Sequence, residues 1–253
     1  MTIFKVILSP LLDKLSRLLE VAYKIFASDY KCKRYKSHLI YQIGTIGISS
    51  LTIVLLTAFF IGIVFTLQVA KELNELHSTS LVGSILTLTF LRELCPVLTA
   101  VIVTGRIGSA FTADIATMKV TEQLDVLHVL NTHPIHYLII PRICACVLMM
   151  PVLNIFSLAT SIASGIITAS SLCSISPTIF LASSSISFIG LCLSSVKALV
   201  FGFLLSLISC AWGLHTTFGT KSVGASTTSS VVTSLLTIFI VDFVLSYIMF
   251  HSS

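Results

Sequence analysis

Long apolar runs alternate with short polar stretches along this chain, and the runs have the length of membrane-spanning helices. A helix needs roughly 20 apolar residues to cross the hydrocarbon core of a bilayer. Five runs meet this requirement, and they cover residues 43–67, 81–104, 143–169, 188–212 and 231–250. The pattern predicts an all-α polytopic membrane protein with about five transmembrane helices.

The start of the chain predicts a different kind of helix. Leu8, Leu11 and Leu15 recur at helical spacing, while Lys14 lies off that apolar stripe. A helix with an apolar face and a basic polar face lies in the plane of the membrane interface. We therefore expect an interfacial amphipathic helix within residues 1–36, with a partner-binding helix as the alternative.

A serine-rich break divides the longest uncharged part of the chain. No Asp, Glu, Lys or Arg occurs in residues 143–196, which is too long a stretch for one spanning helix. Residues 170–187 are rich in Ser and contain Pro177. We place the division between the third and fourth spans there, with room for a short surface helix.

Composition supports a membrane location for the whole chain. Apolar residues make up 55% of the 253 residues and charged residues 10%, whereas a soluble domain has about 25% charged residues. Lipid tolerates this deficit because it does not require a polar exterior. The length fits one membrane domain, residues 1–253.

The basic residues indicate topology, not nucleic-acid binding. The net charge is +5, but eight of the fifteen Lys and Arg precede residue 38. Basic segments next to spans stay in the cytoplasm. This rule places the N-terminus and the loops 105–142 and 213–230 in the cytoplasm, and they hold twelve of the fifteen basic residues.

Cysteine and histidine do not form a convincing metal site. Cys144 and Cys146 follow His133 and His136, so a metal site is conceivable from residue type alone. Pro134 interrupts the histidine pair, and the two cysteines begin a spanning run in which Cys acts as a small apolar residue. We expect no bound metal.

Four charged residues lie inside predicted spans, where each costs roughly 2.5–3.5 kcal/mol on insertion scales. They are Arg92, Glu93, Lys197 and Asp242. Such charges usually face a cavity or a partner, and Pro96 removes a helical hydrogen bond nearby. We expect Arg92, Glu93 and Lys197 to line a substrate pathway. The alternative is a structural ion pair of Arg92 and Glu93 with Lys197 or Asp242, and for Asp242 a structural partner is our expectation.

Other motifs bear on packing and on catalysis. A run of small residues, which lets helices approach closely, follows the second span and comprises Gly105, Gly108, Ser109 and Ala110. No G-x-x-x-x-G-K-[ST] phosphate loop and no H-E-x-x-H or G-x-S-x-G motif occurs. We therefore expect no catalytic residues and no cofactor bound by this chain.

Five short stretches carry a family resemblance. Residues 92–98 read R-E-L-C-P-V-L, residues 105–110 read G-R-I-G-S-A, and residues 118–125 read M-K-V-T-E-Q-L-D. Residues 131–142 and 241–245 add N-T-H-P-I-H-Y-L-I-I-P-R and V-D-F-V-L. These stretches resemble motifs of the MlaE/YrbE family of ABC transporter permeases. The chain departs from the family pattern at Cys95, where Gly is usual, and at His133, where Asp is common.

The resemblance implies a transport complex. Such permeases form a homodimer on two copies of a P-loop ATPase subunit, which uses the ATP, and an MCE-domain lipid-binding protein caps the far side. The complex moves phospholipids or related lipids between the inner membrane and the MCE protein. The resemblance also implies a coupling helix that docks on the ATPase, with Lys119, Thr121, Glu122, Gln123 and Asp125.

The resemblance further implies a multi-pass protein of the bacterial inner membrane with a cytoplasmic N-terminus, or of the chloroplast inner envelope in a plant. A secondary transporter or channel that uses the intramembrane charges as an ion relay is the main alternative. The sequence shows no internal repeat of the kind such transporters often have.

Overall fold

The computed structural model describes residues 36–76, 78, 81–130, 134–172, 176–183, 187–217 and 219–251. All of the regular structure in this part of the chain is helical. The predicted interfacial helix lies outside the described residues.

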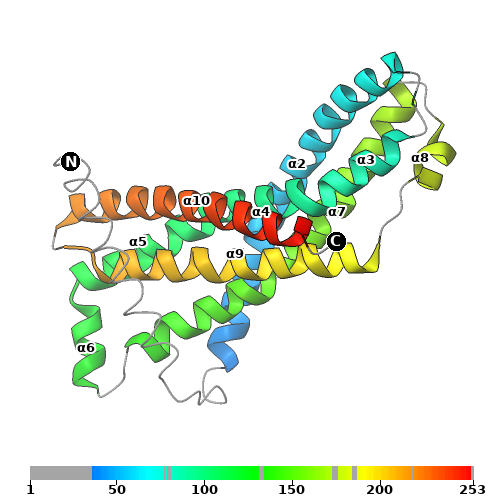
Figure 1. Cartoon of the computed structure of the whole chain (residues 1–253). Coiled ribbons are helices and arrows are strands. Elements are labelled where there is room, and N and C mark those ends of the chain that lie inside the picture. The colour runs from blue at the N-terminus through cyan, green and yellow to red at the C-terminus, as the bar shows by residue number, and fades with distance from the viewer. Residues whose placement is uncertain are drawn as a thin grey trace. The chain divides into compact units, whose positions relative to one another are not determined.

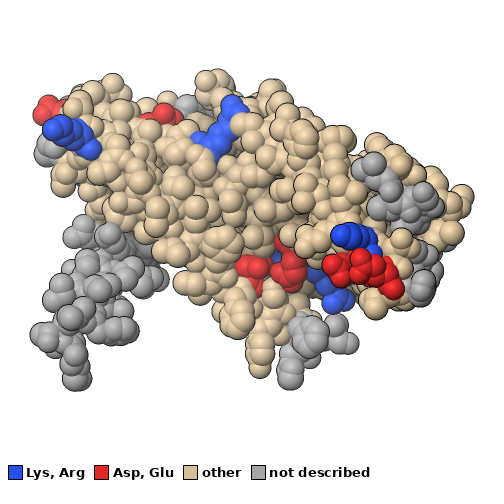
Figure 2. Space-filling model, turned by 90° about the horizontal axis from the view of Figure 1, so that it is seen from above, with Lys and Arg blue, Asp and Glu red and all other residues tan. Residues whose placement is uncertain are grey.

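Five helical segments among the described residues are long and apolar enough to cross a membrane, which confirms the predicted all-α polytopic fold. They are Leu39–Glu75, Val82–Val120, Tyr137–Ser171, Phe188–Leu214 and Thr220–Met249. Charged side chains are sparse on the face shown in Figure 2, as expected for a surface whose solvent is lipid.

The first two spans are longer than their apolar runs. Helix α2 extends over Lys36–Glu75. The second span is one helical run made of α3 (Val82–Thr89), η3 (Phe90–Leu94), α4 (Cys95–Val103), η4 (Thr104–Gly108) and α5 (Ser109–Val120). The η elements are π-helical turns, in which hydrogen bonds join residues five apart instead of four.

The second span therefore continues past its predicted end at residue 104. Its last part is polar enough to suggest a loop, but Phe111, Ile115 and Ala116 lie on one buried side of α5. Their spacing is helical, so the charged residues of this stretch occupy the other faces of a helix. The loop predicted at 105–142 is correspondingly shorter and begins at Thr121.

Helix α6, the third span and the short helix α8 precede the fourth span. Helix α6 covers Gln123–Val129, and the third span consists of η5 (Ile135–Ile139) followed by α7 (Ile140–Leu172). The short helix α8 (Pro177–Ser183) occupies the predicted serine-rich break. Proline suits the first position of a helix, where its missing N–H is not needed.

The last two spans are α9 (Phe188–Leu214) and α10 (Thr220–His251). The prediction of a loop over 213–230 is wrong, because helix α10 already begins at Thr220. Hydroxyl groups explain the discrepancy. Thr227 and Thr228 both donate to the backbone carbonyl of Gly224, at 2.7 and 3.0 Å. A Ser/Thr-rich stretch can thus satisfy its own polar groups within a helix.

The chain forms two compact units. The first contains Thr104–Cys146, Phe203–Thr237 and the described part of Met1–Ile43, and the second contains Gly44–Val103, Val147–Gly202 and Ile238–Ser253. Within the second unit, α3 and α8 lie together with the end of α2 (Figure 1). A buried cluster that includes Leu86, Phe90 and Phe180 holds them together.

Candidate functional site

The candidate site begins at the π-helical turn η3, which presents Arg92 and Glu93 inside the second span. The backbone N–H of Cys95 bonds to the carbonyl of Phe90, five residues earlier. Pro96 follows at once and has no N–H to donate. The carbonyl of Arg92, four residues before Pro96, therefore lacks its α-helical donor.

Lys197 of α9 supplies that donor. Its ammonium Nζ lies 3.0 Å from the carbonyl oxygen of Arg92. The Lys197 side chain is 1% exposed, so its charge is almost completely removed from solvent. A buried ammonium must have its hydrogen bonds satisfied, and the carbonyl left without a donor at Pro96 provides one acceptor.

Two carboxylates neutralise the buried ammonium. Lys197 Nζ lies 3.0 and 3.1 Å from the two oxygens of Glu93 and 3.2 Å from Asp242 Oδ1. Ser246 completes the group, since its hydroxyl accepts from Lys197 at 2.8 Å and donates to Glu93 at 3.0 Å. The charge cluster is thus formed by Glu93, Lys197, Asp242 and Ser246, from η3, α9 and α10.

Arg92 is oriented differently. Its side chain is exposed, and no carboxylate of the described residues pairs with its guanidinium. Successive residues of a helix point about 100° apart, so Glu93 turns toward Lys197 while Arg92 turns away. The turn η3 thus places an available cation beside a cluster that already carries one negative charge more than positive.

The structure brings some of the predicted site residues together and separates others. Glu93 and Lys197, which were both predicted on the pathway, form the ion pair that was named as the alternative, and Lys197 also pairs with Asp242. Sequence reasoning missed Ser246. Its position one helical turn after Asp242 was the available signal, because residues four apart share a helix face.

Lys119 has a different neighbour from the rest of its predicted group. Its ammonium donates to the backbone carbonyl of Leu214, the last residue of α9. A cation stabilises a helix C-terminus, where carbonyl groups lack partners. Lys119 therefore holds the end of α9, whatever its part in coupling.

The remaining residues of the predicted coupling group lie on the surface. Thr121, Glu122, Gln123 and Asp125 are all exposed at the corner between α5 and α6, while Leu124 is buried. Glu122 has a φ of 59°, a left-handed conformation that non-glycine residues adopt rarely. This residue turns the chain sharply from one helix into the next.

The residues of the small-residue run differ in how closely they pack. Gly108 approaches α9 so closely that a Cβ there would lie 3.0 Å from Ser209 Oγ. Ser109 donates to the carbonyl of Gly105 at 2.6 Å, and Gly105 and Ala110 are exposed. Within the described residues, close packing of this run is thus seen at Gly108.

A buried arginine that sequence reasoning did not single out lies in the first unit. Arg142 is 5% exposed, and its Nη2 lies 3.3 Å from Asp114 Oδ2. Its guanidinium also lies 5.4 Å from the ring centroid of Phe111, within cation–π range. Arg142 therefore fastens the start of α7 to α5. Among the described residues no group of three or more His, Cys, Asp or Glu could hold a metal ion.

Comparison with known proteins connects this geometry to a family. Residues 39–248 match the family described as Permease MlaE. A probable ABC transporter permease protein of Synechocystis sp. is 50% identical over 216 residues, which are 84% of this chain and 81% of that protein. A protein of the same description from Pyropia yezoensis is 50% identical over 221 residues, or 86% of this chain and 83% of that protein.

A more distant relative comes from a plant. Protein TRIGALACTOSYLDIACYLGLYCEROL 1, chloroplastic, of Arabidopsis thaliana is 41% identical over 225 residues, which are 88% of this chain and 64% of that protein. The family match includes η3, Lys197 and Ser246, so it covers the whole charge cluster.

Proposed function

This chain belongs to the MlaE permease family of ABC transporters, and we propose that it moves phospholipids or related lipids between its membrane and an MCE-domain lipid carrier. Membership makes it a transport subunit and implies a separate ATPase partner. It also favours the ABC permease prediction over a secondary transporter or channel.

The lipid proposal rests on the different surroundings of two intramembrane cations, one of which is paired and the other exposed. Lys197 is fully engaged with Glu93 and Asp242 at 3.0 and 3.2 Å. Arg92, on the same π-helical turn as Glu93, remains exposed. A guanidinium donates two parallel hydrogen bonds to a phosphate, which an ammonium cannot do. Arg92 is therefore suited to hold the phosphate of a lipid headgroup.

The proposal also explains why these charges persist in a span. An apolar residue would cost less than a charged residue in lipid. A cavity that admits a headgroup offsets this cost because it gives the charge a polar neighbour. The name of the Arabidopsis relative contains that of a glycerolipid, which agrees with a lipid cargo.

The partners of the proposed complex follow from the same reading. We propose a homodimer whose ATPase docks at the cytoplasmic corner formed by Thr121, Glu122, Gln123 and Asp125. Beside this corner, Val126 and Val129 of α6 and the following Leu130 are exposed apolar residues, at 57, 86 and 66% exposure. Exposed apolar patches of this kind mark protein contacts.

The location belongs to the proposal as well. We place the chain in a bacterial inner membrane or a chloroplast inner envelope, with its N-terminus in the cytoplasm or stroma. The MCE protein lies on the opposite side of the membrane. The eight basic residues before residue 38 support this orientation.

The experiment that tests the lipid proposal replaces Arg92 in the complete complex. Arg92→Ala removes the cation. Arg92→Lys keeps the charge but loses the two parallel N–H donors of the guanidinium. We expect both variants to assemble with the ATPase, Arg92→Ala to lose most lipid transfer, and Arg92→Lys to lose part of it. Assembly is measured by co-purification and transfer with labelled lipids in vesicles.

Arg106→Ala is the matched control, since Arg106 is another exposed arginine of the same helical run. It is expected to leave transfer near its starting rate. Failed assembly of Arg92→Ala with the ATPase would instead identify a structural role for Arg92 and contradict the proposal.

A further inference from the structure

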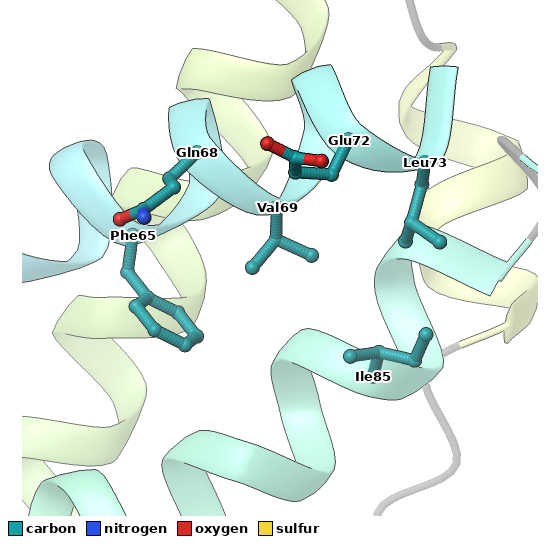
Figure 3. Close-up of a pocket in the computed structure, with 6 residues that line it drawn as sticks. All are labelled: Phe65, Gln68, Val69, Glu72, Leu73 and Ile85. Atoms are coloured by element: carbon teal, nitrogen blue, oxygen red, sulfur yellow. The ribbon is translucent and has the colours of Figure 1, made fainter. Parts of the chain in front are cut away.

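An open groove of about 320 Å³ lies between α2 and α3 in the second unit. This volume is at the lower end of the range of small-molecule sites. The groove is lined by Phe65, Gln68, Val69, Glu72 and Leu73 of α2 and by Ile85 of α3 (Figure 3).

The groove has an apolar floor and a polar edge. Figure 3 shows Phe65, Val69 and Leu73 extending from α2 toward α3, while Gln68 and Glu72 lie along α2 above them. Gln68 and Glu72 are four residues apart, so they share one face of the helix, and both are exposed. An amphiphile fits such a groove, with its chain against the floor and its headgroup at the edge.

The position of the groove along α2 suits a headgroup. The apolar run of the first span covers residues 43–67, and at 1.5 Å per residue it is long enough to cross a hydrocarbon core of ~30 Å. Gln68, Val69, Glu72 and Leu73 follow that run, so the polar edge of the groove lies where the hydrocarbon core ends. Polar headgroups occupy that level of the bilayer.

One residue of the groove, Phe65, contacts the helical turn that carries the candidate site. The ring centroids of Phe65 and Phe90 are 5.7 Å apart, and Phe90 begins the π-helical turn that carries Arg92. A lipid in the groove is therefore next to the element that presents the exposed guanidinium.

We propose that Gln68 and Glu72 make the transporter selective for lipids whose headgroups donate hydrogen bonds. This inference rests on the proposed function and specifies its substrate class. An ionised carboxylate only accepts hydrogen bonds, and an amide oxygen accepts as well. Glu72 repels a bare phosphate and attracts the hydroxyl groups of a sugar or the ammonium of ethanolamine. A choline headgroup carries a cation that Glu72 attracts, but it has no N–H or O–H group and forms no hydrogen bond at this edge.

Binding by the full-length chain in detergent tests the proposal, with native mass spectrometry to count bound lipids. The probes share the same acyl chains and differ only in headgroup: galactose, ethanolamine or choline on diacylglycerol or its phosphate ester. We expect galactose and ethanolamine lipids to bind roughly threefold to tenfold more tightly than the choline lipid, the effect of about one ordinary hydrogen bond.

Substitutions then separate the two donor classes. Glu72→Gln keeps an acceptor but loses the charge, so it is expected to lower ethanolamine binding and leave galactose binding nearly unchanged. Glu72→Ala together with Gln68→Ala removes both acceptors and equalises the three lipids. Glu75→Gln is the matched control, because Glu75 is an exposed carboxylate one turn further along α2 that does not line the groove.

The outcomes distinguish the proposed headgroup selectivity from the proposed lipid transport. A chain that binds and transfers all three lipids equally overturns the selectivity and leaves lipid transport intact. A chain that binds no lipid overturns both. A photo-crosslinker at Leu73 that captures a partner polypeptide in the assembled complex, and no lipid, would show that the groove is a protein docking site.

Discussion

At the scale of single residues, the candidate site depends on an exchange of hydrogen bonds between two distant parts of the chain. Pro96 deprives the carbonyl of Arg92 of its helical donor, and Lys197 replaces that donor from another helix at 3.0 Å. The same ammonium is neutralised by Glu93 and Asp242. One proline thus both opens the backbone and provides an acceptor for a buried charge.

The first prediction concerns Pro96→Ala. Alanine restores an N–H that competes with Lys197 for the Arg92 carbonyl, and it favours an α-helical turn over η3. Such a change of turn moves Arg92 and Glu93 around the helix axis. We expect an unchanged or higher unfolding temperature in detergent, because proline inside a helix costs ~3 kcal/mol, together with a several-fold loss of lipid transfer.

Pro151→Ala controls for this variant, since Pro151 also lies inside a helix, α7, whereas the hydrogen bonds of the charge cluster come from η3, α9 and α10. It is expected to raise stability without a loss of transfer. Equal transfer by Pro96→Ala and the starting protein would show that η3 has no part in placing Arg92.

Sequence alone could identify the charged residues of the cluster but not their contacts. A charge within an apolar run is visible in one dimension, so Arg92, Glu93, Lys197 and Asp242 could be selected. Their pairing depends on which helices adjoin and on how a π-helical turn rotates the chain. The types of the residues do not reveal that a backbone carbonyl accepts a hydrogen bond from Lys197.

At the scale of helices, hydroxyl groups decide where spans begin and how they pack. Thr112 of α5 donates to Ser230 of α10 at 2.8 Å or to the carbonyls of Gly108 and Ser209, each at 3.0 Å. All of these atoms are buried. Polar side chains between membrane helices contribute about 0.6 kcal/mol each on average.

The second prediction is that Thr112→Val lowers the stability of the helix packing. Valine has nearly the same shape but leaves Ser230 without its partner at 2.8 Å. We expect a loss of roughly 1 kcal/mol in the free energy of unfolding, measured by denaturant titration in detergent micelles.

Thr117→Val serves for comparison, because Thr117 lies exposed on the same helix and bonds only within it, to Asp114. Its effect is expected to be within a few tenths of a kcal/mol. If the Thr112→Val chain is as stable as the Thr117→Val chain, the hydrogen bond between Thr112 and Ser230 does not stabilise the helix packing.

A helix boundary could be predicted from the sequence only where the apolar run and the helix end at nearly the same residue. The fourth span ends at Leu214, close to its predicted end at residue 212. The fifth begins at Thr220, because its first residues are polar yet helical. Hydropathy measures transfer into lipid, and a helix can continue past the membrane surface without changing its backbone.

At the scale of the whole molecule, each of the five described spans contributes residues to both compact units. The unit boundaries cut the chain at residues 43/44, 103/104, 146/147, 202/203 and 237/238, each within a span. Neither unit is therefore a continuous piece of the chain that could be excised. Arg142 with Asp114 belongs to one unit and the charge cluster to the other.

The third prediction concerns the orientation of the chain in the membrane. A cysteine placed at Gln123, which is exposed at the start of α6, is expected to react with a membrane-impermeant maleimide only from the cytoplasmic side. In the assembled complex it is expected to crosslink to the ATPase, because the proposed docking corner includes it.

The parent chain without the added cysteine gives the background, which matters because Cys192 is exposed. Labelling of Gln123→Cys from the opposite side of the membrane would invert the proposed topology. Cytoplasmic labelling without any crosslink would keep the topology and move the ATPase contact elsewhere.

The corner at Glu122 affects which mutations the chain tolerates. With a φ of 59°, this residue occupies a conformation that costs an L-residue roughly 1–2 kcal/mol and that glycine adopts freely. The usual order of replacements is therefore inverted at this position. Glycine, among the most disruptive substitutions elsewhere in a helical protein, is the mildest change for the backbone here. Valine and isoleucine, ordinary residues of a membrane helix, are the harshest.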